Sequence, residues 1–383
     1  MTRKTDIVVT TIFEPAWLDG YLTNLATYGR SDDVTIRIVC DRKTPDSVYS
    51  AAAAAQGRGF AVDCPTLDEQ TAYLAKLGLE DFVPWDTDNR RNIGFLKAWE
   101  SGAEVLISID DDNYCRDGSD YVAEHHVVGT SVKDLSGHRV AGGAPWFNIC
   151  SLLDIEPVAP VYPRGYPYAA KRPEAQAALG DLFAGDSSSV VAINAGLWLD
   201  DPDADAITRL ALSPHVRSAS TTPVLFERGT WSPINTQNTA LIRDAISAYY
   251  YVRMGFELHG LKIDRFGDIL SGYFVQACAK HLGHTVRVGS PVVDHRRTPH
   301  NLFKDLHEEL AGVILLEDLV PWLQDVELAG DTYADTYADL AERLLESAAS
   351  FSGMVWDQGG REFLSETALC MQTWLGALRQ LAP

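Results

Sequence analysis

The sequence lacks the long apolar segments that would place the chain in a membrane. No apolar run approaches the roughly 20 residues that span a bilayer. The first six residues lead directly into a short apolar strand, which is too short to be the apolar region of a signal peptide. A cytoplasmic protein without a membrane partner is therefore expected.

Paired cysteines and positive charge are also scarce. The six cysteines include no Cys-x-x-Cys pair, which argues against a disulfide framework and a zinc site. The chain of 383 residues has 32 Lys and Arg against 53 Asp and Glu, for a formal net charge of -21. Such a charge repels nucleic acid, so no nucleic-acid partner is expected. An anionic substrate would need a metal ion or a few well-placed arginines.

Two phosphate-binding motifs are missing. No G-x-G-x-x-G follows the first strand, and no G-x-x-x-x-G-K-[ST] loop occurs anywhere. The first absence argues against a flavin or NAD bound in the usual dinucleotide mode. Phosphate binding would then depend on a metal ion and on side chains.

What the chain does contain is a run of three aspartates, Asp110, Asp111 and Asp112, after an apolar strand. Adjacent carboxylates repel one another unless a cation lies between them. Mg²⁺ and Mn²⁺ accept oxygen ligands of this kind and commonly hold phosphates. Acidic residues also cap the turn after a buried strand, so the triplet alone leaves both interpretations open.

The hydrophobic pattern of the first third alternates between strands and helices. It predicts strands at 7–12, 34–40, 60–62 and 105–109, and helices at 16–28, 51–55, 70–76 and 92–101. Such alternation is typical of an α/β fold with a mainly parallel central sheet, where ligands gather at the carboxyl ends of the strands. Asp41 and the aspartate triplet both follow such strands.

The rest of the chain divides into an irregular part and a helical part. Residues 140–232 are rich in Pro, Gly and aromatics and predict long loops around a pocket. Helices are expected at 239–254, at 268–281 and over most of the chain beyond residue 310. We therefore expect a main domain over residues 1–310 and a helical C-terminal extension over 311–383, packed on it. Tyr333 and Tyr337 would share a packed helix face.

Seven short segments, in this order, carry a resemblance to one known family. They are Asp6-Ile7-Val8 with Thr11-Ile12, Arg91-Asn92-Ile93-Gly94-Phe95, Ile109-Asp110-Asp111-Asp112, Pro145-Trp146-Phe147-Asn148, Arg164-Gly165-Tyr166-Pro167-Tyr168, Gly196-Leu197-Trp198-Leu199 with Pro202-Asp203-Ala204-Asp205-Ala206, and Arg265-Phe266-Gly267-Asp268. By these segments the chain resembles the reversibly glycosylated polypeptides of plants, which act as UDP-arabinopyranose mutases. The resemblance implies a GT-A-like (Rossmann-like) nucleotide-sugar-binding domain.

The resemblance also implies an activity: a metal-dependent, flavin-independent NDP-sugar mutase that interconverts pyranose and furanose rings. Arg164 matches the family arginine that becomes reversibly glycosylated, and Asp268 matches a family acid that would act as general acid/base or bind a hydroxyl. From the residues alone, Arg164 lies in a turn where it would pair with phosphate, and Asp268 would cap a helix. These interpretations stay open.

The resemblance further implies how the substrate is held. Mn²⁺ or Mg²⁺ would be bound by Asp110, Asp112 and His295. The other implied contacts are Arg91 with Asp110 and Asp111 at the diphosphate, Thr11 and Asp41 at the base or ribose, and Trp198, Asn238, Lys171 and Arg172 at the sugar. Lys171 stands where the family has an arginine, and the two are not equivalent at a bidentate site. Trp198 could equally be a core residue, and Arg90 an ordinary solvated helix start.

The expected partner is a GDP- or UDP-linked sugar. The acidic composition does not match the plant setting, and bacterial relatives in secondary metabolism, such as antibiotic biosynthesis, use GDP-sugars, GDP-L-galactose among them. We therefore favour a GDP-sugar over UDP-arabinose or UDP-galactose, by analogy. A metal-dependent GT-A glycosyltransferase that passes the sugar to an acceptor is one alternative, and a non-catalytic nucleotide-sugar binder or partner subunit is another. Members of the family can assemble, so the resemblance also allows a homo-oligomer.

Overall fold

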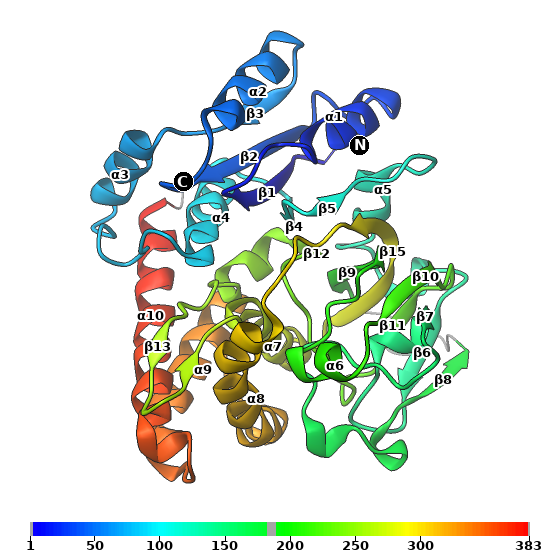
Figure 1. Ribbon diagram of the computed structural model, residues 1–383, viewed down its shortest axis with the longest axis vertical. Helices are drawn as coiled ribbons and strands as arrows, with labels where there is room; N and C mark the ends of the chain where they lie inside the picture. Colours follow the sequence, from blue (N-terminus) through cyan, green and yellow to red (C-terminus); the bar gives the residue numbers. More distant parts are fainter. Residues whose placement is uncertain (1–2, 182–188, 382–383) are drawn as a thin grey trace.

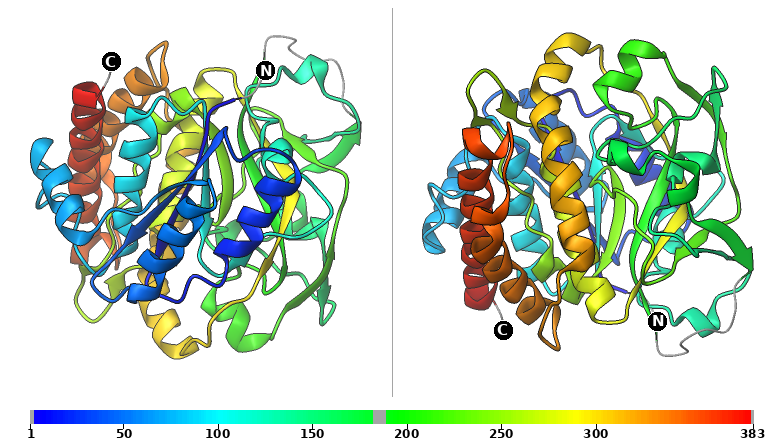
Figure 2. Two further views of the ribbon diagram at one scale, coloured as in Figure 1. Left: turned by 90° about the horizontal axis from the view of Figure 1, so that it is seen from above. Right: turned by 90° about the horizontal axis from the view of Figure 1, so that it is seen from below.

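The computed structural model of the protein describes residues 3–181 and 189–381. One 13-stranded sheet runs through the molecule, with strand order β3-β2-β1-β4-β12-β9-β15-β11-β6-β8 along its main path. Helices cover the sheet, and the C-terminal helices gather at one side (Figures 1 and 2). Among the described residues, no helix combines the length and apolar character needed to cross a membrane.

The first four strands and their helices form a parallel α/β half. The strands are β1 (Thr5–Thr11), β2 (Val34–Cys40), β3 (Ala61–Asp63) and β4 (Val105–Asp110), and the helices are α1 (Leu18–Thr27), α2 (Asp46–Gly57), α3 (Leu67–Lys76) and α4 (Arg91–Glu100). All three strand pairs are parallel. The order β3-β2-β1-β4 is that of a Rossmann-like nucleotide-binding half, so the expected α/β class is confirmed.

Helix α4 packs unusually close to strand β1 because residue 94 is a glycine. A Cβ at Gly94 would lie 2.3 Å from Cγ1 of Val8. The close approach lets the first residue of α4, Arg91, reach the end of β4, where its Nη1 donates to the Ile109 carbonyl at 2.7 Å. Gly94 thus sets the position of Arg91, which lies three residues earlier.

The second half of the sheet differs from the prediction, which placed no strand beyond residue 109. The helix expected at 239–254 is wrong: its start is strand β12 (Asn238–Ile242), followed by a 3-10 helix at Arg243–Ala248. The irregular region contains the ten-residue strand β9 (Val191–Asp200), which pairs with β12 and with β15 (Thr285–His295). Strands β9 and β12 are buried along most of their length, so they carry no alternation that would identify a strand.

Short elements complete this half. They are β5 (Asn113–Tyr114), α5 (Tyr121–His125), β6 (Arg139–Gly142), β7 (Leu153–Glu156), β8 (Ala178–Asp181), α6 (Ala206–Ala211), β10 (His215–Ala219) and β11 (Val224–Phe226), with β13 (Phe256–Glu257) and β14 (Lys262–Ile263) in a separate two-stranded sheet.

The helical end of the chain is confirmed. Helices α7 (Gly267–His281), α8 (Leu302–Asp325), α9 (Tyr333–Ser347) and α10 (Gly360–Leu381) pack against the sheet region. Tyr333 and Tyr337 are buried, as expected for a packing face. Helix α10 lies beside α4, and Nε1 of Trp99 donates to the Leu378 carbonyl at 3.2 Å (Figure 2). Helix α8 begins at Leu302 and continues past residue 310, so the expected domain boundary falls inside a helix.

Candidate active site

A pocket opens at the carboxyl ends of strands β1, β2 and β4. The predicted site residues that line it are Thr11, Asp41, Arg91, Asp110, Asp111, Asp112, Arg164, Asp268 and His295. Parallel strands end at one edge of a sheet, which explains why Thr11, Asp41 and Asp110 meet there. Of the residues from the second half, Arg164 lies in the loop between β7 and β8, Asp268 is the second residue of α7, and His295 ends β15.

The aspartate triplet carries more negative charge than its surroundings neutralise. Burial, followed by the nearby carboxylates of Asp112 and Asp268, raises the pKa of Asp110 to about 7, although Arg91 acts in the opposite direction. Burial also raises the pKa of Asp111 to about 6. This part of the pocket therefore favours a cation.

Arg91 is buried, and the protein occupies its terminal nitrogens. Nη1 donates to Oγ of Ser108 at 2.8 Å and to the Ile109 carbonyl at 2.7 Å. Nη2 donates to Oγ1 of Thr10 at 3.1 Å and to Oδ1 of Asp110 at 2.5 Å. Arg91 therefore positions the end of β4, whereas the sequence predicted a diphosphate clamp.

His295 reaches the triplet because strand β5 pairs with the end of β15. Its Nε2 lies 3.2 Å from Oδ2 of Asp112, and its Nδ1 lies 2.6 Å from the Asp201 carbonyl, to which it donates. Burial would lower the pKa of His295, but the hydrogen bond and charge of Asp112 outweigh burial and raise it. With Nδ1 protonated, Nε2 either donates to Asp112 or, in the neutral ring, can bind a metal ion.

The predicted metal ligands fit a divalent ion in kind. Carboxylate oxygens of Asp110 and Asp112 suit Mg²⁺ and Mn²⁺, and the ring nitrogen of His295 lies beside Asp112. Within residues 3–181 and 189–381, no three His, Cys, Asp or Glu side chains form a ready metal-binding group. Asp110 pairs with Arg91, while Asp112 pairs with His295.

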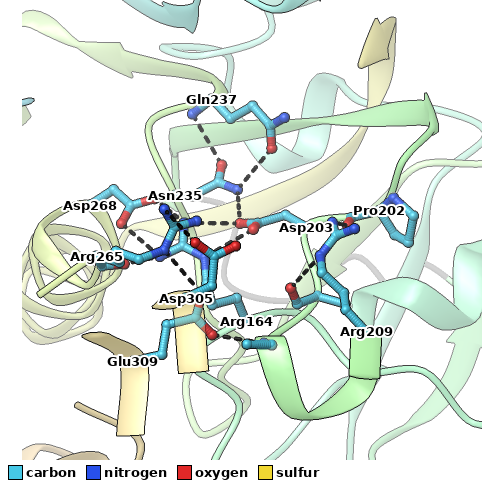
Figure 3. Close-up of polar contacts among 12 residues, drawn as sticks. Arg164, Pro202, Asp203, Arg209, Asn235, Gln237, Arg265, Asp268, Asp305 and Glu309 are labelled. Atoms are coloured by element: carbon cyan, nitrogen blue, oxygen red, sulfur yellow. Dashed lines mark hydrogen bonds and ion pairs between the residues drawn. The ribbon is translucent and has the colours of Figure 1, made fainter. Parts of the chain in front are cut away.

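Arg164 lies between two carboxylates (Figure 3). Its Nε donates to Oδ1 of Asp203 at 2.9 Å, and Nη2 donates to Oδ2 of Asp203 at 3.3 Å and to Oδ2 of Asp268 at 2.6 Å. Nη1 donates to Oδ1 of Asp268 at 3.2 Å and to the Arg265 carbonyl. All five N–H groups of the guanidinium therefore have acceptors.

These contacts determine the charge of the group. Burial would lower the pKa of Arg164, but Asp203 and Asp268 raise it well above its ordinary value. In turn, burial would raise the pKa of Asp203, but Arg164 holds it well below its ordinary value. Pairing with phosphate would break existing contacts of Arg164. Asp268 lies in the first turn of α7, yet its carboxylate binds Arg164 and does not cap the helix.

Asp203, Asn235 and Gln237 were not predicted as site residues. Nδ2 of Asn235 donates to Oδ2 of Asp203 at 2.7 Å, and Oδ1 of Asn235 accepts from the Gln237 backbone N–H at 3.1 Å. The Asp110 N–H donates to the Gln237 carbonyl at 3.2 Å. A hydrogen-bonded path thus joins the Arg164 centre to the triplet. Asp203 lies in the matched segment Pro202-Asp203-Ala204-Asp205-Ala206. The two aspartates of this segment were the sequence feature that could have indicated a site residue there.

The other end of the pocket holds Asp41 and Thr11. Oδ1 of Asp41 accepts from the Arg42 N–H at 2.7 Å, and Oγ1 of Thr11 accepts from the Phe13 N–H at 3.2 Å. The solvated position expected for Arg90 is wrong: it is 1% exposed and its guanidinium lies 3.5 Å from the Trp85 ring centre. Arg90 is buried because it ends the turn that leads into α4, beneath the segment that carries Trp85.

Four residues predicted near the sugar do not line this pocket. Trp198 and Asn238 are buried on the central strands β9 and β12, and Asn238 accepts from the Tyr121 hydroxyl at 2.9 Å. Nζ of Lys171 lies 3.4 Å from Oδ2 of Asp205, and Arg172 is exposed. Trp198 and Asn238 therefore belong to the core, and Lys171 pairs with an aspartate of a neighbouring loop.

Comparisons with known proteins bear on these findings. A family model described as "Reversibly glycosylated polypeptide" matches residues 58–382. UDP-arabinopyranose mutase 2 of Arabidopsis thaliana is 27% identical over 292 residues, which cover 74% of this chain and 70% of that protein. UDP-arabinopyranose mutase 1 of Oryza sativa subsp. japonica is 28% identical over 228 residues, which cover 57% and 54%.

Solved structures give weaker similarity. Mannosyltransferase PcManGT from Pyrobaculum calidifontis, in complex with GDP-Man and Mn²⁺, has a TM-score of 0.41 and 10% identity, covering 98% of this chain and 86% of that one. Glucosyl-3-phosphoglycerate synthase from Mycobacterium tuberculosis has a TM-score of 0.39 and 11% identity, covering 86% and 82%. These scores are too low to carry an argument. The family match, which covers most of the chain, shows that this protein belongs to the reversibly glycosylated polypeptide family.

Proposed function

We propose that the protein is an NDP-sugar mutase that converts a nucleotide-linked pyranose into the furanose and back without flavin. The observation that carries the proposal is the guanidinium of Arg164, held by Asp203 and Asp268 in the pocket that also holds the aspartate triplet. The mutase names of the family's curated members support the same class. Because protein acceptors occupy all five N–H groups of Arg164, a phosphate could pair with this guanidinium only by displacing one of them.

In the first step, Nη2 of Arg164 bonds to C1 of the sugar while the C1–O bond to the diphosphate breaks, and the electron pair leaves with the diphosphate. One Nη2 proton passes to Asp268, whose Oδ2 is 2.6 Å away. Proton transfer must accompany bond formation because the free guanidine is scarce when the guanidinium pKa is so high. Nη2 is the nitrogen that contacts both carboxylates.

Ring size then changes on the protein. The ring oxygen takes the proton from Asp268, the remaining Nη2 proton passes to Asp203, and the ring opens to a C1=N double bond. A different hydroxyl attacks C1 and gives its proton to Asp268, while Asp203 returns its proton to Nη2. The diphosphate finally attacks C1, the C1–N bond breaks, and Arg164 recovers its proton from Asp268. Only the ring size has changed.

The remaining site residues bind the nucleotide part of the substrate. Asp110, Asp112 and His295 would hold a Mn²⁺ or Mg²⁺ ion, which when bound supplies positive charge to the diphosphate. Thr11 and Asp41 line the pocket at the ends of β1 and β2 and would contact the base or ribose. Arg91 keeps Asp110 in position. We propose a GDP-linked sugar such as GDP-L-galactose as the substrate, ahead of UDP-linked arabinose or galactose.

The test is an NMR assay of the anomeric protons. The protein is incubated with Mn²⁺ and, separately, with UDP- and GDP-linked pyranoses, without an acceptor. We expect a furanose product from at least one of them. If the sugar is only hydrolysed, or stays unchanged until an acceptor is added, the protein is a glycosyltransferase and the proposal is wrong.

Intact-mass measurement tests the role of Arg164. We expect an adduct of one sugar residue after substrate is added to wild type, and none with Arg164→Ala, which has no nucleophilic side chain. A protein that only binds nucleotide sugar would form no adduct and give no product. Equal turnover by wild type and Arg164→Ala would show that the arginine is not the acceptor.

A thermal-shift comparison identifies the nucleotide. A ligand that binds only the folded state raises the apparent stability according to its affinity and concentration. With Mn²⁺ present, we expect GDP to raise the melting temperature more than UDP at equal concentration. The opposite order would identify a UDP-sugar enzyme.

A further inference from the structure

Helix α8 reaches the Arg164 centre through one buried carboxylate. Glu309, in the third turn of α8, is 2% exposed. Its Oε2 accepts from the Ala206 N–H at 2.7 Å, and its Oε1 accepts from Nε of Arg265 at 3.1 Å (Figure 3). Ala206 begins α6, three residues after Asp203, and Arg265 lies three residues before Asp268. One side chain thus joins the two segments that carry the partners of Arg164.

Arg265 is also where the backbone is strained. Its φ is +59°, a left-handed conformation that a side chain other than glycine adopts at a cost. In this conformation its carbonyl accepts from Nη1 of Arg164. Its own side chain is held by Glu309 and, at 3.5 Å, by Oδ1 of Asp305, one turn earlier on α8. Helix α8 therefore supports the conformation that presents this carbonyl to Arg164.

The packing of α8 brings its backbone close to the same segment. A Cβ at Gly312 would lie 2.6 Å from Cδ2 of Phe266, so only glycine allows this approach. The Asp264 N–H donates to the Glu308 carbonyl at 3.1 Å. The contacts of Glu309 with Arg265 and Ala206 are thus part of a close docking between α8 and residues 264–266.

We propose that Glu309 is a positioning residue, which sets the spacing of Asp203 and Asp268 around Arg164 and makes α8 part of the reaction centre. The inference rests on the proposed function, because positioning matters only if Arg164 reacts. Small displacements of reacting groups reduce rates strongly, by up to about a hundredfold for an error near 1 Å. Loss of Glu309 should therefore reduce kcat strongly, while the affinity for the nucleotide should change little.

The test compares Glu309→Gln with Glu308→Gln. Glutamine has the same shape as glutamate, but it keeps only one accepting oxygen, so the contact with either the Ala206 N–H or Nε of Arg265 is lost. Glu308 is the neighbouring residue, and its carboxylate pairs with Lys304 at 3.6 Å. We expect at least a tenfold lower kcat and less sugar adduct for Glu309→Gln, with KM and nucleoside diphosphate affinity within twofold of wild type. Glu308→Gln should behave as wild type.

Arg265→Gln provides a second route if Glu309→Gln folds poorly, because it removes the contact between Arg265 and Glu309 from the other side, together with the contact between Arg265 and Asp305, and leaves Glu309 bound to Ala206. The combined effect of the two changes on kcat should be smaller than the product of the single effects, since both variants lose the contact between Arg265 and Glu309. A wild-type kcat in Glu309→Gln overturns the inference. So does a loss of kcat that only follows a loss of nucleotide affinity and thermal stability.

These outcomes are distinct from failure of the proposed function. If Arg164→Ala retains full turnover, the arginine mechanism is wrong whatever Glu309 does. If Arg164→Ala is inactive while Glu309→Gln turns over normally, the mechanism stands and only the positioning role is wrong.

Discussion

Replacing Asp203 with asparagine tests the ionic centre directly. The carboxylate of Asp203 is buried and accepts from Nε and Nη2 of Arg164 and from Nδ2 of Asn235. Asparagine keeps one oxygen, which can still accept from Nε. Its amide group would face Nη2 and Nδ2, which are both donors, so two hydrogen bonds are lost and one negative charge disappears.

The expected loss of stability is about 3 kcal/mol. Hydrogen bonds to charged groups contribute about 1.5–3 kcal/mol each, and breaking a buried ion pair by removing one partner costs about 3–5 kcal/mol. The lower part of this range applies because Asp268 still neutralises Arg164. Turnover should also fall, because Nη2 loses one of its two carboxylate partners.

The assay is urea unfolding of wild type and Asp203→Asn between pH 3 and pH 8. A carboxyl whose pKa is lowered in the folded state contributes its stability above the unfolded pKa of about 3.9 and loses it as pH falls through the folded pKa. The difference in the free energy of unfolding should be constant above about pH 5 and should narrow below about pH 4.

Asp154→Asn is the matched control, because this aspartate is exposed and should change stability by less than about 0.5 kcal/mol. The reasoning is refuted if Asp203→Asn costs no more than Asp154→Asn. It is also refuted if the cost does not decrease in acid, because the charge of Asp203 would then not be its source.

Three further predictions concern the backbone, pH dependence and the metal. Gly165→Ala should cost at least about 2 kcal/mol in urea unfolding, because φ is +83° and a Cβ would lie 2.4 Å from Cγ2 of Ile269. Gly143→Ala, with φ of +78° and nothing within 4 Å, should cost less, and equal costs would contradict the steric argument. Burial lowers the pKa of Lys280 to about 7 in the folded protein. Between about pH 7 and 10 the unfolded state therefore binds more protons than the folded state, and the free energy of unfolding of wild type should rise by up to about 1.4 kcal/mol per pH unit. In Lys280→Met, the free energy of unfolding should rise less between pH 7 and pH 9 than it does in wild type. The same rise in both proteins would contradict this prediction. Chelation by EDTA should abolish turnover and nucleoside diphosphate binding, and Mn²⁺ or Mg²⁺ should restore both; full turnover after chelation would exclude the metal role.

The first third of the fold could be predicted because its information is local. Apolar runs bounded by acids identify β1, β2 and β4, and the intervening helices have the expected periodicity. Parallel strands joined by helices then place Thr11, Asp41 and Asp110 at one edge. Strands β9 and β12 could not be identified in the same way, because burial along most of their length removes the alternation that marks a strand.

The candidate site was only partly predictable for a similar reason. The matched segments identified Arg164 and Asp268, but their roles depended on which atoms face one another. Arg91 looked like a phosphate ligand by type and position, and the folded chain instead uses it to hold Asp110. Trp198 and Asn238 looked like sugar contacts, and the strands that carry them direct both into the core.

By itself, the sequence determined the α/β class, the family and the chemistry available at the ends of the strands, because these depend on residue types and local order. Only the tertiary structure decided that Asp203, Asp268 and the Arg265 carbonyl share the guanidinium of Arg164, and that Glu309 joins the segments around it. These groups come from loops and helices up to about 145 residues apart. Whether such groups lie within hydrogen-bond distance depends on the packing of α6, α7 and α8, which no local pattern encodes.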